Sequence, residues 1–252
     1  MFGDSPLIVL PGHSRALLGV ARTVMATPGL TDVALIGGLA VTMRISAAGV
    51  GHRATIDIDL VTIESEPEAA EILADAHDAE SKHLVIDDIQ VDLIPTFPLT
   101  DPDLEGLEDK DRLFLAGHRW AFEGAEPSRI TAYGADPLTI NVATPAGLVA
   151  TKTHAIGYPT PLRRATKLAS DLLDFFRLVD LYDREGELAA ELRAAPGGIA
   201  RVIADVARRE ILANPTAAAN KMGVASPTPI AVDDVASITE VFVDELLLDA
   251  TT

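Results

Sequence analysis

The sequence contains no cysteine among its 252 residues, which excludes a disulfide framework, thiolate zinc sites and a cysteine nucleophile. Basic residues are also scarce, because 20 Lys and Arg stand against 38 Asp and Glu and give a net charge of −18. This balance argues against a general nucleic-acid coat or an anionic-membrane binder, although a local basic groove is still compatible with it. No stretch reaches the roughly 18 apolar residues of a membrane span, and the N-terminus lacks signal-peptide features. We therefore expect a soluble, cytoplasmic protein without a membrane partner.

The pattern of apolar residues changes character near residue 143. Before that point, apolar periodicity and turn residues predict strands at 33–36, 55–63, 84–86, 89–94, 114–122 and 138–142 and helices over 14–27, 39–48 and 66–80. After it, the pattern predicts only helices, over 146–156, 162–182, 187–194, 199–212 and 233–247, with a linker at 221–229. The sequence thus predicts an α/β domain over residues 1–143 and a helical domain over 144–252.

Three aspartates lie on two of the predicted strands. Asp57 and Asp59 alternate with apolar neighbours, so their carboxylates share one strand face while Ile56, Ile58 and Leu60 anchor the other face in the core. Asp92 repeats the pattern between Val91 and Leu93. Such a cluster repels itself unless a divalent cation or a shared proton lies within it, and carboxylates suit Mg²⁺, with Mn²⁺ as an alternative. The other interpretation is that the three acids are ordinary solvent-facing residues.

Gly37 and Gly38 follow a short apolar run and open a predicted helix. Glycine lets the backbone approach a ligand closely, and a helix N-terminus offers unpaired N–H groups to an anion. A Gly-Gly pair alone is more often a simple strand-to-helix turn. Here it precedes Arg53, Thr55 and the acidic strand by one helix and one loop, which predicts a phosphate-binding corner beside the carboxylates.

Residues 35–60, LIGGLAVTMRISAAGVGHRATIDIDL, resemble the signature of the nucleotidyltransferase superfamily typified by DNA polymerase beta. Within it, the chain is most similar to the AbiEii/AbiGii toxin family, whose members include the MenT-type toxins of type IV toxin–antitoxin systems. That family pairs a Gly-Gly or Gly-Ser helix start with an Arg-x-Thr-x-Asp-hydrophobic-Asp strand and adds a third acid, which Asp92 matches here.

The family's later motif is a Lys followed by a basic stretch that ends in Lys-Asp-x-x-Asp. The similar residues here are Lys152, Arg163, Arg164, Lys167 and Asp171. Leu168 stands where the first Asp of the motif is expected, and Asp174, one helical turn beyond Asp171, is the candidate substitute.

The charge distribution supports the same region independently of the family. Residues 137–170 contain no Asp or Glu, although an even distribution of the 38 acids would place about five there. We expect this window to form a surface that faces phosphates, with Lys152 contacting the triphosphate. Lys167 and Asp171, four residues apart, could also be a simple helix salt bridge.

The resemblance implies a mixed-sheet nucleotidyltransferase core followed by a helical half that completes the nucleotide pocket. Metal would be held by Asp57, Asp59 and Asp92, with Asp92 also a candidate base, and Lys152 and Asp171 would complete the catalytic set. Nucleotide contacts would come from Gly37, Gly38, Arg53, Thr55, Lys152, Arg164 and Lys167.

The expected function is that of a toxin with a cognate antitoxin, which transfers a nucleoside monophosphate from an NTP to an acceptor, tRNA in MenT-type members, and releases pyrophosphate. Two alternatives stay open: a non-catalytic nucleotide- or partner-binding module, motivated by Leu168, and a metal-dependent phosphohydrolase.

Overall fold

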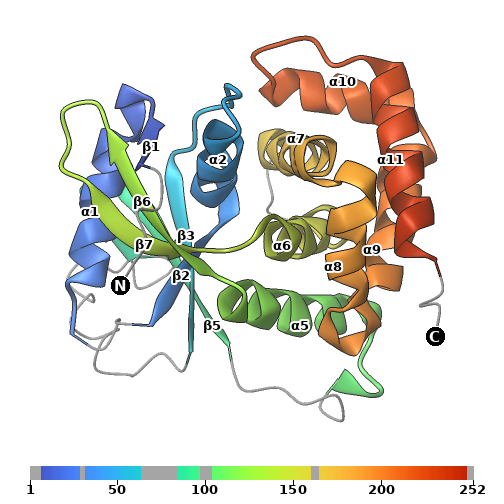
Figure 1. Cartoon of the computed structure of the whole chain (residues 1–252), viewed down its shortest axis with the longest axis horizontal. Helices are drawn as coiled ribbons and strands as arrows, with labels where there is room; N and C mark the ends of the chain where they lie inside the picture. The colour runs from blue at the N-terminus through green and yellow to red at the C-terminus, as the bar shows by residue number, and fades with distance from the viewer. Residues whose placement is uncertain (1–6, 29–31, 64–83, 97–103, 160–164, 249–252) are drawn as a thin grey trace. The chain divides into compact units, whose positions relative to one another are not determined.

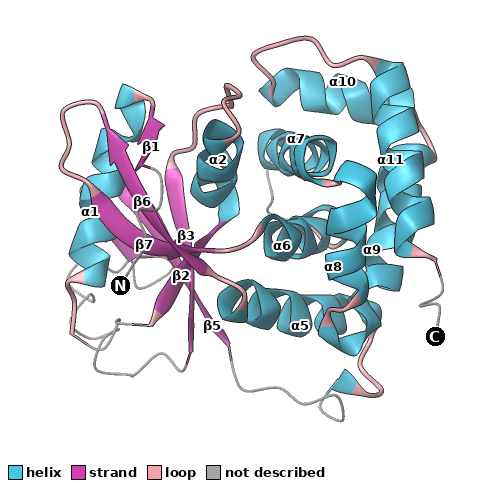
Figure 2. Cartoon of the chain, viewed as in Figure 1, coloured by secondary structure: helices cyan, strands magenta, loops and turns pink. Residues whose placement is uncertain are grey.

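The structure, a computed structural model, describes residues 7–28, 32–63, 84–96, 104–159 and 165–248. The helix predicted over 66–80 lies outside these residues. The chain divides into two compact units, the first formed by Met1–Pro98 and Ala121–Thr144 and the second by Leu99–Trp120 and Pro145–Thr252. Figure 1 colours the chain by residue number, and Figure 2 marks its helices and strands. All strands among the described residues belong to the first unit.

The first unit contains a seven-stranded sheet in the order β1-β6-β7-β2-β3-β5-β4. Its strands are β1 (Leu7–Leu10), β2 (Val33–Ile36), β3 (Asp57–Ile63), β4 (Leu84–Ile86), β5 (Ile89–Thr96), β6 (Glu126–Ala132) and β7 (Leu138–Val142). Strand β2 runs parallel to β7 and antiparallel to β3, and β3 runs parallel to β5. This mixed sheet confirms the expected α/β fold.

Helices α1 (Arg15–Met25) and α2 (Gly37–Ala47) belong to the same unit. All four residues of β2 are buried, as its VALI sequence requires of an interior strand, and α2 begins directly after it. Arg44, in the last turn of α2, donates from Nε to the Ala143 carbonyl at 2.9 Å and from Nη2 to the Val142 carbonyl at 2.8 Å. These bonds fix the C-terminal end of α2 to the end of β7.

Strands β4 and β5 form a hairpin in which Ile86 pairs with Ile89. The two residues between them, Asp87 and Asp88, have φ angles of 50° and 62°. A two-residue turn of the type that matches strand twist needs positive φ at both positions, which Asp tolerates better than most residues. The hairpin therefore closes through a two-residue turn at Asp87 and Asp88.

The second unit is helical. Its helices are α5 (Asp109–Glu123, of which residues 121–123 fall in the first unit), α6 (Pro145–Gly157), α7 (Ala165–Tyr182), α8 (Glu187–Arg193), α9 (Ile199–Ala207), α10 (Pro215–Ala225) and α11 (Val232–Leu246). A π-helical segment, Arg208–Leu212, continues α9. In the core, the rings of Phe175 on α7 and Phe242 on α11 meet edge to face with centroids 5.9 Å apart. In the part of the chain that the structure describes, no helix combines the length and apolar character needed to cross a bilayer.

Two predictions of local structure are wrong. Residues 114–122 are not a strand, because they lie in helix α5, whose buried residues Leu113, Ala116 and Gly117 recur at helical spacing. Small residues let this helix approach α6, since a Cβ on Gly117 would lie 3.4 Å from the Ala150 Cβ. The linker predicted at 221–229 is also partly wrong, because α10 continues to Ala225.

Candidate active site

The three predicted carboxylates lie on the adjacent parallel strands β3 and β5. Asp59 pairs in register with Asp92, and Asp57 pairs with Gln90. Residues in register on neighbouring parallel strands point to the same face of the sheet, so Asp57, Asp59 and Asp92 share one face. All three are partly exposed, whereas their neighbours Ile58, Leu60 and Val91 are fully buried.

Ile56 does not anchor the strand as predicted. Strand β3 begins only at Asp57, and Ile56 is 82% exposed. The burial of Ile58 and Leu60 is therefore what holds the acidic strand in the sheet.

Hydrogen bonds orient two of the carboxylates. Thr55 Oγ1 donates to Asp57 Oδ1 at 2.7 Å, and Gln90 Nε2 lies 3.1 and 3.2 Å from the two carboxylate oxygens of Asp92. Each donor lies two residues before its acceptor: Gln90 is on β5 with Asp92, and Thr55 lies just before β3, which begins at Asp57. Gln90 was not among the predicted site residues, although its position two before Asp92 on a strand placed it on the same face.

The glycine corner lies directly against this carboxylate face. Gly37 has a φ of +66°, and a Cβ built on it would lie 1.7 Å from Asp59 Oδ2. A Cβ on Gly38 would lie 2.7 Å from Thr55 Oγ1 and 3.0 Å from Arg53 Nη2. Glycine at both positions therefore lets the first turn of α2 approach Asp59 and Thr55 this closely.

This corner combines two features that suit a nucleoside triphosphate. The first N–H groups of α2 have no side-chain cap, and unpaired N–H groups at a helix start attract anions. Arg53 adds a guanidinium beside Gly38. The structure thus brings together Gly37, Gly38, Arg53, Thr55 and Asp59, all predicted from the sequence.

The donor set of the carboxylate face suits a hard divalent cation, because Mg²⁺ prefers carboxylate oxygens. One of these oxygens, Asp59 Oδ2, lies at the corner, since a Cβ built on Gly37 would be 1.7 Å from it. As they stand, the described side chains include no group of three or more His, Asp or Glu arranged around one metal position.

In the second unit, Lys152 on α6 is held between two acids of α7. Its Nζ lies 2.8 Å from Asp171 Oδ1 and 2.8 Å from Asp174 Oδ2. The side chain of Lys152 is only 5% exposed, and those of Asp171 and Asp174 are 1% and 0% exposed. The triad therefore joins α6 to α7 through buried charges.

This geometry bears on the expected positions of Lys152 and of the acids on α7. Lys152 does not lie on an exposed phosphate-facing surface, because it is buried and paired. Asp174 contacts the same ammonium as Asp171. Two acids one helical turn apart therefore pair with Lys152, although Leu168 stands where the family motif has its first Asp. Lys167 is half-buried on α7, and Arg164 lies outside the described residues.

The model of one protein family, described as the nucleotidyl transferase AbiEii toxin of type IV toxin–antitoxin systems, matches residues 22–245. The chain belongs to the AbiEii family. It is therefore a nucleotidyltransferase and a toxin of the type IV class, and AbiEii membership implies an NTP substrate and an antitoxin partner. Comparison with curated proteins and with solved structures gave no match.

Proposed function

We propose that this AbiEii protein transfers a nucleoside monophosphate from an NTP to tRNA and releases pyrophosphate, as MenT-type toxins do. The observation that carries the proposal is the contact between the Gly37 position and Asp59 Oδ2. It places a helix start that suits phosphates against the carboxylate face that suits a cation.

In the proposed reaction, a hydroxyl oxygen of the acceptor forms a bond to the α-phosphorus of the NTP. The bond between the α-phosphorus and the oxygen that bridges to the β-phosphorus breaks, and pyrophosphate leaves. Asp92 accepts the proton of the attacking hydroxyl. Catalysis of such a transfer depends mainly on positioning and charge stabilisation, so the bonds from Thr55 to Asp57 and from Gln90 to Asp92 are important because they fix carboxylate orientation.

We assign the nucleotide phosphates to the N–H groups at Gly37 and Gly38, to Arg53 and to Thr55. Asp57, Asp59 and Asp92 would hold Mg²⁺ or Mn²⁺, which neutralises phosphate charge and lowers the pKa of the acceptor hydroxyl when bound.

From the second unit, we propose that Lys152, Arg164, Lys167 and Asp171 also contribute to activity. For Lys152 and Asp171 the observed pairing supports a positioning role, since the buried triad fixes α6 to α7.

Transfer is tested by incubating the purified protein with total RNA and each of the four NTPs labelled at the α-phosphate, in buffer that contains Mg²⁺. We expect label in the tRNA fraction with at least one NTP, and loss of that label after ribonuclease treatment. Label that stays in protein would contradict the tRNA acceptor.

A parallel reaction with label at the γ-phosphate separates transfer from hydrolysis. Transfer releases labelled pyrophosphate, whereas a phosphohydrolase releases labelled inorganic phosphate. Release of inorganic phosphate in this reaction, together with unlabelled RNA in the reaction with α-labelled NTP, would contradict the proposed reaction.

A further inference from the structure

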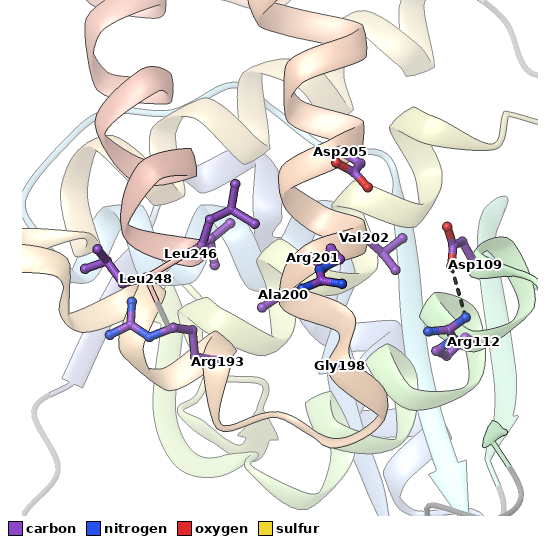
Figure 3. Close-up of a pocket in the computed structure, with 11 residues that line it drawn as sticks. Asp109, Arg112, Arg193, Gly198, Ala200, Arg201, Val202, Asp205, Leu246 and Leu248 are labelled. Carbon is purple, nitrogen blue, oxygen red and sulfur yellow. Dashed lines mark ion pairs between the residues drawn. The ribbon is translucent and has the colours of Figure 1, made fainter. Parts of the chain in front are cut away.

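A pocket of about 380 Å³ lies within the second unit, and none of the residues that line it is among the predicted site residues. Figure 3 shows that side chains from several helices surround it, including Arg112 of α5, Arg193 of α8 and Arg201 of α9. The lining holds three arginines against two aspartates, Asp109 and Asp205, which is a local excess of positive charge in a chain of net charge −18.

These guanidinium groups retain donors for a ligand. Each guanidinium has five N–H donors. Arg112 uses Nη2 for the Leu107 carbonyl and for Asp109, both at 3.1 Å, and Arg193 donates from Nη1 to the Glu245 carbonyl. Arg201 is exposed and has no hydrogen bond or ion pair with any residue that the structure describes.

The start of helix α9 opens into the same pocket. Gly198 and Ala200 line the pocket, and Gly198 is the N-cap residue, with a φ of 62°, no capping side chain and no acid in the first turn after it. A Cβ on Gly198 would meet nothing within 4 Å. The first N–H groups of α9 therefore lack a side-chain acceptor and attract an anion.

The remaining lining distinguishes a nucleotide from a simple anion. Val202 and Leu246 supply apolar surface, which suits a base or a sugar ring, and Asp109 and Asp205 supply carboxylates that accept hydrogen bonds from hydroxyl or amino groups. The volume falls in the range of about 300–1,000 Å³ that is typical of small-molecule sites.

We infer that this pocket binds one nucleotide through its phosphate group, with arginine donors and the start of α9 holding the phosphate. Arginine forks match phosphate geometry and form charge-assisted hydrogen bonds. The nucleotide is either a free mononucleotide or one unit of an RNA strand, since both present a phosphate ester on a ribose.

The test is isothermal titration calorimetry of the full chain in buffer that contains EDTA. AMP and a short single-stranded RNA are titrated as separate probes. The variant is Arg201→Gln, which removes an exposed charge without a described partner. Its matched control is Arg208→Gln, because Arg208 is also exposed and lies in the π-helical continuation of α9 but does not line the pocket.

We expect Arg201→Gln to weaken binding of at least one probe about tenfold, while Arg208→Gln leaves it within about twofold. An effect on AMP identifies a free mononucleotide, and an effect on RNA alone identifies a unit of a strand. The inference would be overturned if neither probe binds the unmodified protein. It would also be overturned if the two variants bind both probes with equal affinity, whether or not that affinity is reduced. Neither outcome depends on whether the protein transfers nucleotides.

Discussion

Replacement of Gly37 by alanine tests the glycine corner, because two separate costs arise there. The φ of +66° strains any residue with a Cβ, at about 1–2 kcal/mol. The Cβ would also lie 1.7 Å from Asp59 Oδ2, whereas ordinary contacts begin at 3.4 Å. The carboxylate must therefore move by about the difference, and a displacement near 1 Å at a reacting centre can lower the rate about a hundredfold.

Gly49→Ala separates these two costs. Gly49 also lies in the first unit, with a φ of +77°, but a Cβ there would meet nothing within 4 Å. Urea unfolding and transfer of labelled NMP are measured for both variants. We expect Gly49→Ala to lose about 1–2 kcal/mol of stability and Gly37→Ala to lose more, because its Cβ also collides with Asp59. Only Gly37→Ala loses transfer activity, by about a hundredfold. Equal activity of the two variants would refute the importance of this contact.

Two further predictions concern buried ionisable groups in the second unit. Lys152→Met leaves the carboxylates of Asp171 and Asp174 buried without their shared ammonium. It should cost about 3–5 kcal/mol in urea unfolding, and adding Asp171→Asn and Asp174→Asn should restore part of that loss; a cost below about 1 kcal/mol would contradict a buried triad. Burial lowers the pKa of His118 from 6.5 to about 4, against the opposing bond to the Phe114 carbonyl. Unfolding below pH 6.5 therefore takes up a proton, so stability should fall as the pH drops towards 4, by up to roughly 3 kcal/mol. His118→Asn should lack this part of the pH dependence, and an unchanged pH profile would contradict it.

Much of the first unit could be predicted because its signals are local. The buried run Val33–Ile36, the Gly-Gly helix start and the Asp87-Asp88 turn each define an element by a few adjacent residues. Helix α5 was missed because Phe114, Trp120 and Phe122 favour strands by propensity. Packing overrode that preference, since small residues at helical spacing allow α5 to lie against α6.

The site residues of the first unit could be chosen from alternation along a strand, but their arrangement could not. Register between β3 and β5 decides that Asp59, and not Asp57, lies opposite Asp92, and register depends on contacts distant in sequence. For Lys152, charge counting favoured an exposed surface, whereas pairing with acids 19 and 22 positions later makes burial tolerable. The signal available was the Asp171-x-x-Asp174 spacing, which places both acids on one helix face.

The role of the carboxylate face is tested most directly by comparing Asp59→Asn with Asp88→Asn in the same transfer assay. Both changes remove one negative charge from the first unit, and Asp88 lies in the exposed hairpin turn with a φ of 62° that Asn also adopts. We expect Asp59→Asn to lower the rate of NMP transfer by at least about a hundredfold and Asp88→Asn to retain it. Transfer by Asp59→Asn at the rate of the unmodified protein would contradict the assignment of catalysis to this face.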